Sequence, residues 1–307
     1  MNAGDGNRLV ATASSNEIKN FTCTRWAEIK ETVSYHAQMS ALLQIPTIFR
    51  LLNQPSVGNL PQEFSIADKG PEMIEEDLRV ANDTMNMSSP GGVTPLAEHV
   101  RTIKTQVEAL APTLRVEGKR VVVVLATDGL PSNHMGVSGQ AELNDFTSAL
   151  RSLEGLPIWL VVRLCTDDSD VVDFYNDLDK QLELSIEVLD NYLDEAKEMY
   201  RANPWITYTL ATHRMREMGF QHRIFDILDE RKLTHSEVRE FCLLIFGRDS
   251  FDGVPEAEVD WKGFLQAINS MASREPSQWH PMKRTSKPIV SVKKLNNIYG
   301  TGGCTIM

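Results

Sequence analysis

One stretch constrains the fold of this chain more than any other: residues 120–133 read RVVVVLATDGLPSN. The run from Val121 to Ala126 is apolar at every position, so an extended strand there has two faces to bury. A strand that is buried on both faces is typical of a parallel sheet with helices on each side. The strand then meets an acid, Asp128, which leads into Gly-Leu-Pro-Ser-Asn.

The segments around this strand alternate between helix and strand. Apolar residues at helical spacing predict helices near 25–43, 72–86, 95–111, 141–153 and 170–182. Strands are predicted at 47–52, 120–127, 157–165 and 184–190, and residues 53–71 are expected to form a loop. This alternation predicts a doubly wound α/β domain over residues 1–190, with a mostly parallel sheet and helices on both faces.

The rest of the chain has a different pattern. Residues 191–271 are expected to form a helical extension, in which Thr234 and Glu237 have the spacing of a capping box. From residue 272 the composition becomes rich in Pro, Ser, Lys, Asn and Gly, and a disordered, basic tail is predicted over 272–307.

Composition and charge narrow the classes of function. The chain has 307 residues and a net charge of −11, which argues against nucleic acid as a main partner. Its four cysteines form no C-x-x-C pair, no apolar run is long enough to span a bilayer, and the N-terminus lacks a signal pattern. A cytoplasmic protein without disulfides is expected.

Two short stretches predict a cation site. In an open α/β sheet, ligands bind outside the carboxyl ends of the strands, where Asp128 is predicted to lie, and Mg²⁺ prefers oxygen ligands. The second stretch is GGVTPL at 91–96. Its alternative interpretation is structural, with Thr94 as a helix N-cap and Pro95 as the first helical residue.

GGVTPL, a helix and VVVVLATDGLPS, taken in that order, resemble the von Willebrand factor type A domain family over roughly residues 20–190. TRWAEIKETV is similar to the family's first helix. The resemblance implies a metal-ion-dependent adhesion site at the top of the sheet, in which Thr94 and Asp128 are ligands of Mg²⁺ or another divalent cation. It also implies recognition of a protein partner rather than catalysis.

The family's D-x-S-x-S segment, which supplies the other side-chain ligands, occurs nowhere in this chain. In the family a Met often follows that segment, so we expect the chain to begin, at Met1, just inside the domain. Loss of the family's first strand would leave neighbouring strands unpaired.

Three functions remain open: a metal-dependent binding module, a hydrolase that uses Asp128 in the same crevice, and a scaffold whose metal site is inactive. No nucleophile–base motif is present, so an enzyme is not expected. His99 and His134 flank the predicted site. A calcium loop at 248–259 is not expected, because Arg248 and Val259 stand where an EF-hand needs carboxylates.

The chain ends in Cys-Thr-Ile-Met, which matches a farnesylation signal at Cys304. Five basic residues and no acidic residue lie between 276 and 307. Because one lipid gives only weak membrane binding, these cations would act as a second signal on an anionic membrane surface.

Overall fold

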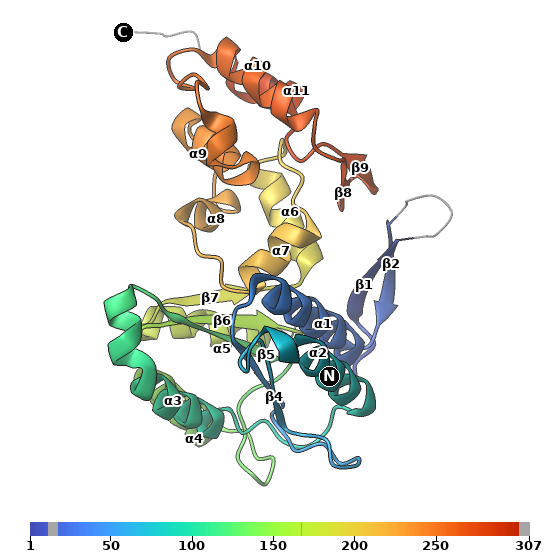
Figure 1. Ribbon diagram of the computed structural model, residues 1–307, viewed down its shortest axis with the longest axis vertical. Coiled ribbons are helices and arrows are strands. Elements are labelled where there is room, and N and C mark those ends of the chain that lie inside the picture. The colour runs from blue at the N-terminus through green and yellow to red at the C-terminus, as the bar shows by residue number, and fades with distance from the viewer. Residues whose placement is uncertain (12–17, 167, 301–307) are drawn as a thin grey trace. The chain divides into compact units, whose positions relative to one another are not determined.

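The computed structural model describes residues 1–11, 18–166 and 168–300, which divide into two compact units (Figure 1). Unit 1 contains residues 1–9 and 20–191, together with a short return segment, Glu217–Gly219. Unit 2 is built mainly from residues 192–216 and 220–300. The longest segment of unit 1 ends at Asn191.

The first half of the chain mixes strands and helices. Its elements are β1 (Gly6–Ala11), β2 (Ile18–Cys23), α1 (Arg25–Leu43), β3 (Thr47–Arg50), β4 (Glu63–Ile66), η1 (Pro71–Met73), α2 (Ile74–Met87), α3 (Leu96–Glu117), β5 (Val121–Thr127), α4 (Gln140–Arg151), β6 (Ile158–Leu164), α5 (Ser169–Gln181) and β7 (Ile186–Leu189).

The centre of unit 1 is a parallel sheet with the strand order β5-β6-β7. All seven residues of β6 are buried, as expected for the middle strand of a covered sheet. Helices α3, α4 and α5 contribute buried apolar residues to the core that also contains Leu160 and Val162 of β6. Trp159 and Val161, which alternate with these along the strand, form a second buried cluster with Leu189. The prediction of an α/β domain with parallel strands and flanking helices is confirmed at this level.

The strands of unit 1 do not form one continuous sheet. β3 and β4 pair with each other in a separate antiparallel sheet, and β1 and β2 form another two-stranded sheet. The prediction that residues 53–71 form a loop is wrong for β4, which lies inside this segment. Phe64 and Ile66 of β4 are buried, and Phe64 stacks on Phe49 of β3 with ring centroids 5.3 Å apart. Helices α1 and α2 pack on this small sheet.

A charged side chain lies in the middle of the most buried strand. Arg163 of β6 is 2 % exposed and ion-paired with both Glu28 of α1 and Glu217 of the return segment. Its Nε lies 2.5 Å from Glu217 Oε1, and its Nη1 lies 2.8 Å from Cys165 Sγ. Because an unpaired charge inside a protein costs several kcal/mol of folding free energy, these partners are needed to stabilise the charged form of Arg163 in the sheet. We call Arg163, Glu28, Glu217 and Cys165 the buried arginine cluster.

The pKa values of this cluster follow from burial and charge. Burial acts to lower the pKa of Arg163, but the electrostatic effects of Cys165, Glu217 and Glu28 outweigh it and raise the pKa above its ordinary value. Burial raises the pKa of the Cys165 thiol. Arg163 therefore stays a cation, held by the two carboxylates and in contact with Cys165 Sγ.

The return segment also fits closely against the sheet. Gly219 has a positive φ of 82°, and a Cβ at this position would lie 2.3 Å from Cγ1 of Val122 on β5. Both the backbone conformation and the lack of space require glycine here.

Unit 2 is mainly helical, as predicted. Its elements are α6 (Tyr192–Ala202), α7 (Leu210–Glu217, whose last residue belongs to unit 1), α8 (Arg223–Leu228), α9 (His235–Phe246), η2 (Arg248–Phe251), α10 (Trp261–Ala272), β8 (Gln278–His280), β9 (Thr285–Lys287) and α11 (Val292–Tyr299).

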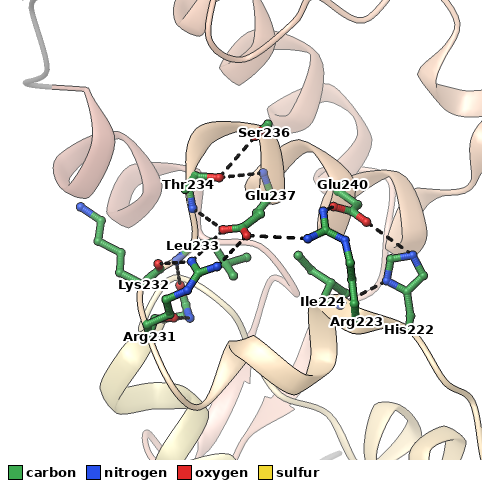
Figure 2. A network of polar contacts seen from close by, with 11 residues as sticks. His222, Arg223, Ile224, Arg231, Lys232, Leu233, Thr234, Ser236, Glu237 and Glu240 are labelled. Atoms are coloured by element: carbon green, nitrogen blue, oxygen red, sulfur yellow. Dashed lines mark hydrogen bonds and ion pairs between the residues drawn. The ribbon is translucent and has the colours of Figure 1, made fainter.

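The predicted capping box at the start of α9 is confirmed (Figure 2). The Glu237 backbone N–H donates to Thr234 Oγ1 at 3.3 Å, and the Thr234 N–H donates to Glu237 Oε2 at 2.8 Å. Figure 2 also shows Arg231, whose two terminal nitrogens lie 2.7 and 2.8 Å from the Glu237 carboxylate. The bonded Arg231 guanidinium lowers the pKa of Glu237 to about 2. One carboxylate thus caps a helix and holds the preceding loop.

The prediction of a disordered tail from residue 272 is wrong for residues 278–299. β8 and β9 pair as a hairpin, and Leu295 and Tyr299 of α11 are buried. Val290 is also buried and forms a β-bridge with Ile206. A few apolar residues at suitable spacing are enough to fix this segment, although its composition is that of a linker.

Candidate functional site at the carboxyl edge of the sheet

Asp128 follows the last residue of β5, at the carboxyl edge of the parallel sheet, as predicted. The turn that carries it is held from both sides. The Gly129 N–H donates to Thr127 Oγ1 at 3.3 Å, and the Tyr175 hydroxyl of α5 donates to the Gly129 carbonyl at 3.2 Å. Thr127 and Tyr175 are buried, whereas the Asp128 side chain is 25 % exposed. The sheet thus presents this carboxylate at its surface from a fixed turn.

The loop containing Thr94 is fixed by its neighbours. Asn53 accepts from the Val93 N–H at 3.2 Å and donates from Nδ2 to the Val93 carbonyl at 2.8 Å. Gly92, with a φ of 96°, has the Asn53 side chain 2.6 Å from where a Cβ would stand. A larger residue at position 92 would therefore displace Asn53 and the loop.

Thr94 is bound to the loop that follows Asp128. Its backbone N–H donates to Ser132 Oγ at 2.8 Å, and the Ser132 N–H donates to the Thr94 carbonyl at 2.9 Å. The structure therefore brings the two predicted segments together, although 38 residues separate Thr94 from Ser132.

The structural interpretation of Thr94 as an N-cap is wrong. α3 begins at Leu96, its N-cap is Pro95, and no side chain caps it by a hydrogen bond. The Thr94 hydroxyl is thus not engaged in capping, so its oxygen atom can still act as a ligand of a hard cation.

The immediate neighbours of the Asp128 carboxylate are cations of the protein itself. It forms an ion pair with the ammonium group of Met1, and Arg25 Nη1 lies 3.6 Å from Asp128 Oδ2. Arg25 is held at the start of α1 by Asp5, with Nε 2.7 Å from Asp5 Oδ1. A divalent cation on Asp128 would have to bind beside the guanidinium of Arg25, which opposes it electrostatically.

Asp128 and Thr94 offer oxygen atoms, the donor type that Mg²⁺ prefers, but they are fewer than the six ligands of a complete magnesium shell. Within residues 1–11, 18–166 and 168–300, no three or more His, Cys, Asp or Glu side chains form a metal-binding group. Backbone carbonyls, water or a partner's carboxylate would have to complete the coordination.

A groove of about 410 Å³ lies beside the Thr94 loop. Its lining is largely polar and includes both residues that flank Thr94. The predicted neighbours His99 and His134 both line it; His99 Nε2 lies 3.0 Å from the Leu52 carbonyl, and His134 Nε2 lies 3.7 Å from Glu98. The lining residues are Arg50, Leu52, Asn53, Gln54, Gln62, Glu63, Val93, Pro95, Glu98, His99, Thr102 and His134.

Sequence patterns gave no indication of the polar residues around β3 and β4 that line this groove. Asn53 and Gln62 lie in a stretch that was interpreted as loop, and polar loop residues carry no periodicity to distinguish them. The remaining predicted site residue, Cys304, lies outside the residues that the structure describes. In the described part of the chain, no helix is both long and apolar enough to cross a membrane.

Comparison with known proteins adds no assignment to these observations: no protein-family model matches the chain, and no curated protein sequence matches it either.

Proposed function

We propose that unit 1 is a protein-binding module whose recognition surface combines the Asp128 turn, the Thr94 loop and the adjoining groove. The observation that carries the proposal is the reciprocal pair of hydrogen bonds between Thr94 and Ser132, at 2.8 and 2.9 Å. These bonds join two segments, distant in sequence, at the carboxyl edge of the sheet, where α/β domains bind ligands.

In this proposal Mg²⁺ or a similar cation is held by Asp128 and Thr94, as the resemblance to von Willebrand factor type A domains implies. The ion supplies a positive centre that binds a carboxylate of the partner. The chain's own residues position that partner. The groove beside Thr94 carries an ion pair between Arg50 and Glu63 and the exposed carboxylate of Glu98, and these groups can bind polar and basic groups of an extended segment of polypeptide.

Isothermal titration with MgCl₂ tests the metal-dependent form of this proposal. Asp128→Asn removes the carboxylate charge with little change in shape, and we expect it to weaken Mg²⁺ binding by about tenfold or more. Asp173→Asn on α5 is the matched control, because Asp173 is exposed and its loss changes the net charge equally. Equal Mg²⁺ binding by both variants, or no binding by the unmodified chain, would contradict a metal site at Asp128.

One observation favours a second form of the proposal, in which the same surface binds a protein without a metal ion. Arg25 lies 3.6 Å from Asp128 Oδ2 and can neutralise this carboxylate itself. The substitution Arg25→Gln distinguishes the two forms. It removes a cation that competes with Mg²⁺, so it should strengthen Mg²⁺ binding in the metal-dependent form and leave the titration flat in the metal-free form.

A further inference from the structure

Two ammonium groups lie over the ring of Tyr200 in unit 2. Lys283 Nζ is 5.3 Å from the ring centroid and Lys294 Nζ is 4.9 Å from it. The ring of His280 meets the same tyrosine edge-on, with centroids 5.3 Å apart. Tyr200 comes from α6, His280 from β8 and Lys294 from α11, so three elements converge here. We call Tyr200, Lys283, Lys294 and His280 the lysine–tyrosine cluster.

Both lysines are held in place by the fold. Lys283 lies in the hairpin turn between β8 and β9, where its N–H and that of Arg284 donate to the His280 carbonyl at 3.1 and 2.8 Å. Lys294 donates from Nζ to the Pro204 carbonyl at 2.7 Å. With the Nζ atoms 5.3 and 4.9 Å from the centre of the Tyr200 ring, the two charges are close together before a ligand binds, which reduces the entropy lost on binding.

This cluster carries positive charge that the protein does not neutralise. Five cations lie between residues 276 and 300, where the sequence has no acidic residue, and none of the five has an ion-pair partner in the part of the chain that the structure describes. They are Lys283, Arg284, Lys287, Lys293 and Lys294. Of these five, Lys283 and Lys294 lie together at the ring of Tyr200, and because like charges repel, an anion bound between these two would stabilise the folded unit.

His280 gives an independent indication. It is 4 % exposed, and among the described residues neither of its ring nitrogens has a hydrogen-bond partner. Burial, followed by the charges of Lys294, Lys283 and Lys287, lowers its pKa to about 4. Buried polar groups are normally hydrogen-bonded, and an N–H group of this imidazole, which lies beside two lysines, can donate to an oxyanion.

Tyr200 responds to the same charges. The neighbouring Lys283 ammonium lowers the pKa of the Tyr200 phenol below its usual value, against the effect of burial, and Lys294 adds to this. The phenol is also a hydrogen-bond donor, so the cluster offers both charge and an O–H group to an oxyanion.

We propose that Lys283, Lys294 and Tyr200 form a binding site for a phosphate monoester, with His280 beside it. Doubly charged phosphate matches two ammonium groups better than a carboxylate does, and its three oxygen atoms can accept from both lysines and the phenol at once. The proposal does not depend on the function suggested for unit 1.

Titration with inorganic phosphate, followed by NMR of the His280 ring and by calorimetry, tests the site. The double variant Lys283→Gln, Lys294→Gln should bind phosphate at least about tenfold more weakly. The matched control is Lys262→Gln, Lys293→Gln, which removes the same charge from exposed positions on α10 and α11; its affinity should change less than about twofold.

Vesicles distinguish the source of the phosphate group. Sedimentation with phosphatidylcholine vesicles containing phosphatidic acid, compared with phosphatidylcholine alone, reports a lipid headgroup; binding of inorganic phosphate without vesicle binding assigns a soluble ligand. Either result supports the site if the double variant abolishes it and the control does not.

Equal loss in both double variants, or no binding of phosphate and no binding of vesicles, would overturn the proposal. Tyr200→Phe keeps the ring that the lysines cover and removes only the hydroxyl. It should weaken phosphate binding several-fold while leaving the melting temperature unchanged, so the proposal remains testable if the double lysine variant unfolds. Asp128→Asn should have no effect on phosphate binding, which separates this test from that of unit 1.

Discussion

The buried arginine cluster of unit 1 and the lysine–tyrosine cluster of unit 2 differ in whether their positive charge is compensated by nearby carboxylates. In the first, one cation lies between two carboxylates inside the protein. In the second, cations gather at the surface of the fold with no acidic residue in the same segment. A compensated charge holds a structure together, whereas an uncompensated one is available to a ligand. The two clusters should therefore respond differently to substitution.

The largest effect is expected from Arg163→Met. It leaves Glu28 and Glu217 beside each other in the core without their shared cation, and removing one partner of a buried ion pair costs about 3–5 kcal/mol. Chemical denaturation followed by tryptophan fluorescence should show this loss in the free energy of unfolding. Arg151→Met, at an exposed position at the end of α4, is the control and should change stability by less than about 0.5 kcal/mol.

A rescue variant sharpens this prediction. Combining Arg163→Met with Glu28→Gln and Glu217→Gln removes all three charges, so much of the lost stability should return. If the triple variant is as unstable as Arg163→Met alone, the loss comes from packing and not from the charges of two carboxylates that have lost Arg163.

The Glu237 network in Figure 2 is intermediate between these two clusters, because the Glu237 carboxylate is buried whereas its partner Arg231 is half exposed. The pKa of Glu237, about 2, is below its ordinary value of 4.5, so the stability it contributes is present above pH 4.5 and is lost as the pH falls toward 2. Glu237→Gln should lower the free energy of unfolding at pH 7 by about 1 kcal/mol. Thermal melts at pH 7 and pH 3 check this: the difference between the two proteins should shrink at pH 3, and a constant difference would contradict it.

The smallest effect concerns one proton on Tyr200. Lys283→Gln removes the bonded ammonium that lowers the pKa of the phenol, so this pKa should rise toward its ordinary value of 10. Ultraviolet absorbance titration measures the change, and the Tyr200→Phe protein identifies which transition belongs to this residue. Lys293→Gln should leave the transition where it is; an equal shift there would mean that net charge alone controls it.

Local features of this fold could be predicted from the sequence because they depend on neighbouring residues. The strand expected at 120–127 is observed as Val121–Thr127, and the capping box of Thr234 and Glu237 forms as its spacing indicates. One long-range feature is an exception: the approach of the Thr94 loop to the turn after β5 was expected from the resemblance to von Willebrand factor type A domains.

Features that depend on distant partners could not be predicted. Arg163 lies 54 residues from Glu217 and 135 from Glu28 along the sequence, and a pattern of neighbouring residues cannot predict pairs that are so far apart. The lysines of the last segment were interpreted as a solvated tail because composition alone carries no information about Leu295 and Tyr299 packing into unit 2. Long-range contacts, not propensities, decide both cases.

The return of the chain at Glu217–Gly219 has a practical consequence. Glu217 supplies one of the two carboxylates on Arg163, and Gly219 fits against Val122 where no side chain has room. A protein shortened at residue 191, after the last strand of the parallel sheet, would lack both. The two units are therefore interleaved along the sequence. A protein that ends at residue 191 lacks residues that belong to the interior of unit 1.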